Sequence, residues 1–141
     1  MGLAEKRVLE EFKKTFTNTL LPQLKSSTPF ELEYEVVWDD IYKVMESDSL
    51  NMQDTSDYFV HVFVTPTIAA FKSICADEMG TNALKGFLKK VKFCNTASNC
   101  VTQAYKMENG VLTVDHCRAN IDDYYTKERG DFLTKTLEKA L

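Results

Sequence analysis

Apolar residues recur every three or four positions along the first 24 residues of the chain, with charged residues between them. This spacing predicts an amphipathic helix over residues 3–24. Pro22 cannot donate the hydrogen bond of a helix interior, so the helix is expected to kink or end near Leu20. The polar stretch 25–29 is then expected to be a linker.

The next stretches predict two strands. Apolar and polar residues alternate over 30–38, as in a half-buried strand whose polar face carries Glu31, Glu33 and Glu35. Residues 39–45 predict a short helix capped by an Asp, and the polar stretch 46–56 predicts a loop. Residues 58–64 form a nearly unbroken apolar run rich in β-branched and aromatic side chains, which predicts a central strand covered on both faces.

The middle of the chain predicts a helix pair. Thr65 is expected to cap a helix with Pro66 at its first position, Gly80 to end it, and Thr81 to cap a second helix. A short strand is expected over 91–94, followed by a polar turn.

The strongest local signal is a hairpin over 105–116. Asn109-Gly110 lies between alternating apolar residues, and both residue types tolerate the positive φ angles of a type I′ turn. A last helix is expected to be capped by Asn120 or Asp122 and weakened by about 1 kcal/mol at Gly130.

Together these elements predict one α+β domain over residues 1–141. Consecutive strands near the end of the chain favour a mainly antiparallel sheet of about five strands, with N- and C-terminal helices and the middle helix pair packed on it. The length and the 44% hydrophobic and 27% charged residues are those of an ordinary globular domain.

The charge and the apolar pattern narrow the classes of partner. A net charge of −4 argues against nucleic acid, although Lys85, Lys89, Lys90 and Lys92 form a local cluster that is best explained as a solvated helix face. No apolar run reaches the length of a membrane span, and residues 1–7 lack the apolar core of a signal peptide. We therefore expect an acidic, soluble, cytoplasmic protein.

Four cysteines in 141 residues are a low density for a disulfide-stapled domain, so reduced thiols are expected. Cys94 and Cys100 flank a short step that could close as a hairpin, which leaves a disulfide there open. Cys94, Cys100, His116 and Cys117 are also the one group whose residue types suit zinc. Their spacing differs from the close pairs of structural zinc sites, so no metal and no cofactor are expected.

The chain has two histidines, and His116 is the better candidate for acid–base chemistry. His61 lies within the most apolar run and is expected to be a core residue. His116 ends a predicted strand, and nearby carboxylates and phenols could orient or neutralise its ring. These neighbours are Asp115, Asp122, Tyr124 and Tyr125.

Two hypotheses of function follow. Because no catalytic motif is present, the first is a noncatalytic binding or regulatory module for an unknown protein or small molecule. The second is a small enzyme of unknown reaction centred on His116, Asp115, Asp122 and Tyr124. A concave pocket around a perturbed His116 would favour the enzyme, and a buried, packed imidazole would favour the module. A homodimer is compatible with either hypothesis.

Overall fold

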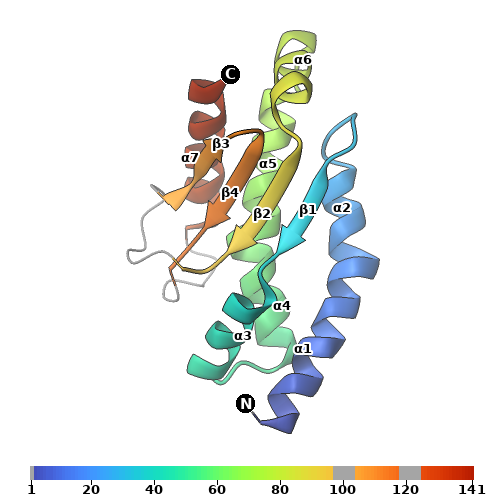
Figure 1. Cartoon of the computed structure of the whole chain (residues 1–141), viewed down its shortest axis with the longest axis vertical. Helices are drawn as coiled ribbons and strands as arrows, with labels where there is room; N and C mark the ends of the chain where they lie inside the picture. The colour runs from blue at the N-terminus through green and yellow to red at the C-terminus, as the bar shows by residue number, and fades with distance from the viewer. Residues whose placement is uncertain (1, 97–103, 118–124) are drawn as a thin grey trace.

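A computed structural model describes residues 2–96, 104–117 and 125–141. The helical segments and strands follow one another along the chain as α1 Leu3–Thr15, η1 Phe16–Leu20, α2 Leu21–Lys25, β1 Glu33–Val36, α3 Trp38–Ser47, α4 Met52–Phe59, η2 Val60–Val64, α5 Thr65–Ile74, α6 Glu78–Phe87, β2 Lys90–Cys94, β3 Lys106–Glu108, β4 Val111–Asp115 and α7 Thr126–Ala140 (Figure 1). The fold is α+β, as expected, but its sheet is not the predicted one.

The sheet is mixed and mostly parallel. Its described strands are four, in the order β1-β2-β4-β3, and β1 pairs parallel with β2 and β2 parallel with β4. Of these four, β3 alone runs antiparallel to its neighbour. The prediction of a mainly antiparallel sheet of about five strands is therefore wrong. The parallel pairing of β1 with β2 follows from the connection between them. This connection contains α3 to α6 and returns the chain to the end of the sheet from which β1 started.

The predicted central strand over 58–64 is part of a helix. Segments α4, η2 and α5 follow without a break from Met52 to Ile74, and Tyr58, Phe59 and Phe63 in their middle are at most 1% exposed. A helix that passes through the core is apolar all round, and periodicity alone does not separate such a segment from a buried strand. The length of the surrounding helical pattern decides between them.

Both long helices contain a five-residue π-helical segment directly before a proline-containing turn. In η1 the N–H of Leu21 donates to the carbonyl of Phe16, and in η2 the N–H of Thr65 donates to the carbonyl of Val60. The next residue in each case is Pro22 or Pro66. The wider turn accommodates a ring that would clash with the carbonyl four residues earlier in an α-helix, so neither proline ends its helix.

Three further boundaries differ from those predicted. Helix α3 extends to Ser47 and a capping box of Asn51 and Asp54 starts α4, so most of the predicted 46–56 loop is helical. The middle helices are separated at Asp77, whose side chain accepts the N–H of Gly80. Gly80 therefore lies in the first turn of α6 and does not end a helix. Thr65 likewise lies inside a continuous helix rather than at its cap.

The predicted hairpin is confirmed. Strands β3 and β4 pair Met107 with Leu112 and Glu108 with Val111, and Asn109 and Gly110 between them have φ angles of 54° and 78°. The last helix is also confirmed as α7, in which Gly130 is an interior residue. The two predicted caps, Asn120 and Asp122, lie outside the described residues.

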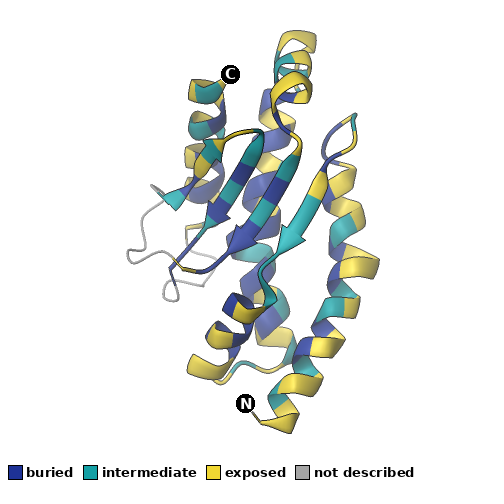
Figure 2. Cartoon of the chain, viewed as in Figure 1, coloured by how far each residue is buried: buried dark blue, intermediate teal, exposed yellow. Residues whose placement is uncertain are grey.

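The two faces of the sheet have different surroundings. One face, which includes Val91, Phe93, Leu112 and Val114, is buried against the helices that lie behind the sheet in Figure 1 (Figure 2). The opposite face carries the alternate residues of each strand, and it holds Lys90 2.7 Å from Glu35 in an ion pair. None of the described helices is long and apolar enough to cross a membrane.

Candidate functional site

A buried polar cluster lies where β2 and β4 end. Because these strands are parallel and adjacent, their carboxyl ends meet at one edge of the sheet, a common place for sites in α/β proteins. Asn95 follows β2 and His116 follows β4, and both side chains are buried. His116 is thus at the end of a strand, as the sequence predicts.

Asn95 connects four segments of the chain. Its Nδ2 donates to the carbonyls of His116 and Cys117 at 3.0 and 2.9 Å, and its Oδ1 accepts the hydroxyl of Tyr58. Its backbone N–H donates to Asp40 Oδ2 at 3.2 Å. Every polar group of the Asn95 side chain therefore holds another buried polar group, which is the arrangement of a structural hub.

The His116 imidazole is held inside the protein. The residue is 5% exposed, and its Nδ1 lies 2.8 Å from the carbonyl of Cys117, a distance at which Nδ1–H donates. Burial lowers the pKa of His116 below the ordinary value of 6.5, and the positive charge of Arg129 acts in the same direction. The ring is therefore neutral at physiological pH and its described contact is with backbone.

Of the predicted partners of His116, Asp115 acts on the ring through its charge, which raises the pKa of the imidazole by less than burial lowers it. The carboxylate of Asp115 also accepts from the backbone N–H and the hydroxyl of Thr96, each at 2.7 Å, across the ends of β2 and β4. Tyr125 directly precedes α7 and is 45% exposed. Asp122 and Tyr124 lie outside the described residues.

The cysteines that the structure describes are in two states. Cys75 and Cys94 are free thiols, whereas Cys117 is in a disulfide bond. The expectation of reduced thiols is thus wrong for Cys117, and the Cys94 to Cys100 disulfide that the sequence left open is not formed, because Cys94 is free. Burial, followed by the charge of Asp115, raises the pKa of Cys94 to about 12, so its thiol is protonated and a poor metal ligand.

The suggested metal group finds no support in the described part of the chain. There, no three His, Cys, Asp or Glu side chains come close enough to hold a metal ion. Cys117 is oxidised, and Cys100 lies outside the described residues. Of the four candidate ligands, Cys94 and His116 come from the ends of adjacent strands and serve the buried cluster described above.

Arg129 of α7 is a polar core residue that no pattern in the sequence indicated. It is 1% exposed, and its Nη1 donates to the carbonyl of His61 at 3.1 Å. In η2 the N–H of Thr65 donates to the carbonyl of Val60, and Pro66 has no N–H. The N–H groups four and five residues after His61 are therefore not available to the His61 carbonyl. The guanidinium supplies the missing donor and joins α7 to the long central helix.

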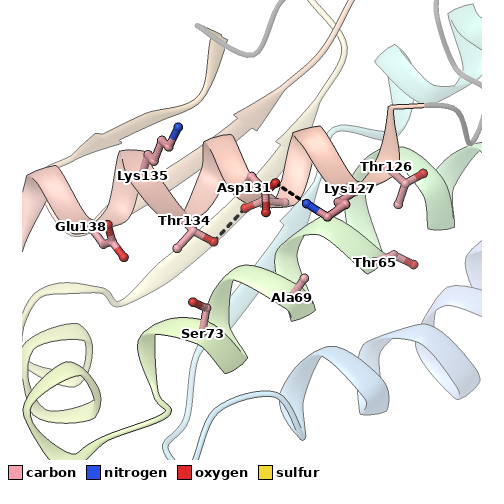
Figure 3. A pocket seen from close by; sticks show the side chains of 10 residues that line it. Thr65, Ala69, Ser73, Thr126, Lys127, Asp131, Thr134, Lys135 and Glu138 are labelled. Atoms are coloured by element: carbon pink, nitrogen blue, oxygen red, sulfur yellow. Dashed lines mark hydrogen bonds and ion pairs between the residues drawn. The ribbon is translucent and has the colours of Figure 1, made fainter.

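An open groove of about 720 Å³ lies between α5 and α7 (Figure 3). The two helices run in the same direction behind the sheet (Figure 1). The groove is lined by Thr65, Ala69 and Ser73 of α5 and by Thr126, Lys127, Gly130, Asp131, Thr134, Lys135 and Glu138 of α7. Of the site residues predicted from the sequence, none that the structure describes lines this groove.

Small residues create this groove. Thr65, Ala69 and Ser73 recur every fourth position, which places them on one face of α5. On the facing helix, a Cβ atom built on Gly130 would lie 3.5 Å from the Cβ of Ala69. The two helices therefore approach closely below the surface, and the small side chains leave a channel above the contact.

The rim of the groove is charged and its far end is apolar. Lys127 and Asp131 form an ion pair at 2.9 Å, whereas Lys135 and Glu138 form none with any described residue. A second hollow of about 320 Å³ shares Ser73 and Glu138 with the groove. It is lined at its end by Leu141 and by Met79, which is 82% exposed. The groove thus continues to an exposed apolar patch.

Comparison of the chain with protein-family models, with curated protein sequences and with solved structures finds no match.

Proposed function

We propose that this protein is a noncatalytic binding module that holds a helical segment of a protein partner in the groove between α5 and α7. The observation that carries the proposal is the groove itself, an open channel between two helices with small side chains along its floor. Amphipathic helices are commonly bound in such grooves, with anchors at spacings of three and four residues.

The dimensions and chemistry of the groove support a helix as its occupant. From Thr126 to Glu138 it follows α7 for about 18 Å, or more than three helical turns. The floor of Gly130 and Ala69 lets another backbone approach closely. The charged rim would orient the segment, and Met79 and Leu141 at the far end offer it an apolar anchor.

The alternative of a small enzyme centred on His116 has less support from the geometry. The imidazole is buried and its Nδ1 is engaged by a carbonyl, and Asp115 is engaged by Thr96. The residues that line the groove include no histidine or cysteine, and Asp131 is paired with Lys127. Among the described residues, these groups hold the structure together and leave no nucleophile beside a free base.

A helical-peptide display library tests the proposal. Peptides selected on the protein are expected to lose binding to a Ser73→Trp variant, because the indole would fill the channel. Thr17→Trp is a matched control, since Thr17 is also an exposed helical hydroxyl residue but lies outside the groove. The proposal fails if the selected peptides bind the two variants equally well, or if no peptide binds.

The compartment is a separate proposal. A disulfide at Cys117 favours an oxidising compartment over the cytoplasm expected from the sequence. Alkylation of the denatured protein without reductant, after isolation from its source with thiols trapped, is expected to label Cys75 and Cys94 and to spare Cys117. Labelling of Cys117 in that sample would return the assignment to a reducing compartment.

A further inference from the structure

We infer that the helix bound in the groove is α7 of a second copy of this chain, packed antiparallel about a two-fold axis. The inference rests on the proposed function, because it assumes that the groove receives a helix. It adds the identity of that helix, which the charges along the groove indicate.

The groove face of α7 has a charge pattern that complements itself. Lys127, Asp131, Lys135 and Glu138 all line the groove and alternate in sign at spacings of three and four residues. The Lys135 side chain is directed away from α5 (Figure 3). Reading the pattern from either end gives opposite charges at matching positions. A helix with such a face attracts an antiparallel copy of itself and repels a parallel one.

One position of the two-fold axis satisfies both kinds of pair. An axis crossing α7 between Phe132 and Leu133 places Lys127 opposite the partner's Glu138. It also places Asp131 opposite the partner's Lys135, with an axial mismatch below about 1 Å at a rise of 1.5 Å per residue. Because the contact is isologous, each pair occurs twice, giving four ion pairs between the subunits.

Two of these charges are available without loss of an existing contact. Lys135 and Glu138 form no ion pair with the described residues, and both side chains are exposed. Lys127 and Asp131 already pair at 2.9 Å and would extend their pair into a network across the interface. Self-association would therefore add ion pairs between the subunits without breaking an ion pair within either subunit.

The surface between the charges allows close contact. Thr134, the groove residue of α7 nearest this axis, has a short side chain, and Gly130 is buried against Ala69 of its own subunit. Two helices of this length, flanked by α5 of each subunit, form an interface near the lower end of specific interfaces, which bury about 1,200 Å² or more in total. We therefore expect a reversible dimer with micromolar affinity that weakens at high salt.

Sedimentation velocity over micromolar to submillimolar concentrations tests the inference. The wild-type chain is expected to dimerise. Glu138→Lys and Lys127→Glu should each weaken the dimer by about ten-fold or more, because each places like charges together twice. Glu11→Lys is the control, since it makes the same charge change as Glu138→Lys on exposed α1, away from the groove.

Mixing the Lys127→Glu and Glu138→Lys variants gives the decisive result. In a mixed dimer, the glutamate introduced at position 127 of one subunit meets the lysine introduced at position 138 of the other. The unchanged Glu138 of the first subunit meets the unchanged Lys127 of the second. An equimolar mixture is therefore expected to form heterodimers although neither variant self-associates strongly. Circular dichroism of each variant alone establishes that loss of the dimer is not loss of the fold.

Three results would overturn the inference: a wild-type chain that stays monomeric over this range, a dimer that Glu138→Lys weakens no more than Glu11→Lys does, or a mixture that fails to associate. None of them affects the peptide experiment above. If selected helices still bind the groove and Ser73→Trp blocks them, the proposed function stands and its partner is another protein.

Discussion

Replacing Asn95 with Asp probes the buried hub at the strand ends with almost no change of volume. The substitution keeps one oxygen for the Tyr58 hydroxyl and exchanges the donating Nδ2 for a second oxygen. That oxygen would face the carbonyls of His116 and Cys117, which now accept from Nδ2 at 3.0 and 2.9 Å. No cavity is created, so the measured effect reports on polar groups alone.

The expected loss is large. Each of the two carbonyls is left buried without its donor, at about 1–3 kcal/mol for each, and a carboxylate is placed where the side chain of Asn95 is fully buried. We expect Asn95→Asp to lower the free energy of unfolding by about 4 kcal/mol at neutral pH, a large share of the roughly 5–15 kcal/mol typical of a domain. Burial raises the pKa of the new carboxyl in the folded state, so the deficit should shrink as pH falls toward about 4.

Urea unfolding monitored by the fluorescence of Trp38 measures this loss. Trp38 is the single tryptophan and packs against Phe12 and Phe16, with ring centroids 6.0 and 5.6 Å apart. Thr96→Val is the control, because it removes one exposed hydrogen bond at the same edge and should cost less than about 1 kcal/mol. If Asn95→Asp were no more destabilising than Thr96→Val, the hub would not hold the strand ends together.

Three further sets of substitutions test the remaining contacts. Arg129→Met keeps the apolar stem but leaves the His61 carbonyl without its donor, so urea unfolding should show a loss of about 2–3 kcal/mol. The pKa of His116 is lowered in the folded state, so below about pH 6.5 the unfolded chain binds more protons at this residue than the folded protein does. The contribution of His116 to the free energy of unfolding is therefore fully present above that pH and is lost as the pH falls below it. His116→Gln should flatten this fall between about pH 7 and 5, and an unchanged slope would exclude His116 as its source. Gly130→Ala should raise the melting temperature, since its Cβ meets Ala69 at an ordinary 3.5 Å and helix propensity improves by about 1 kcal/mol. Gly80→Ala should lower it, since a Cβ there would clash with the carbonyl oxygen of Ile74.

Elements defined by local chemistry were predictable. Asn109-Gly110 indicates the hairpin because a type I′ turn needs two consecutive positive φ angles. Both angles belong to the turn residues themselves, so the requirement does not depend on the rest of the fold. The first and last helices follow from their own amphipathic spacing. Each of these predictions depends on residues within about four positions of one another, so no knowledge of the rest of the fold is needed.

Elements defined by their surroundings were not predictable. The run 58–64 is apolar on every side, and whether such a segment is a strand or a helix depends on what packs around it. Here that helix is buried by α1 and the sheet, with Phe59 tilted against Phe12 at 5.3 Å between ring centroids. Mistaking it for a strand also added a fifth strand to the predicted sheet, whereas the antiparallel direction was inferred from the consecutive strands near the end of the chain.

The prolines show how a local rule can hold while its expected consequence fails. Pro66 does remove a backbone donor and does crowd the preceding turn, as the rule states. The chain accommodates it by widening that turn in η2 and by supplying the donor from Arg129, 68 residues from His61. The helix therefore continues, and the proline fixes where a buried arginine is needed. The same relation accounts for the groove, since the arginine ties α7 beside α5 and the small residues on both helices then leave the channel open.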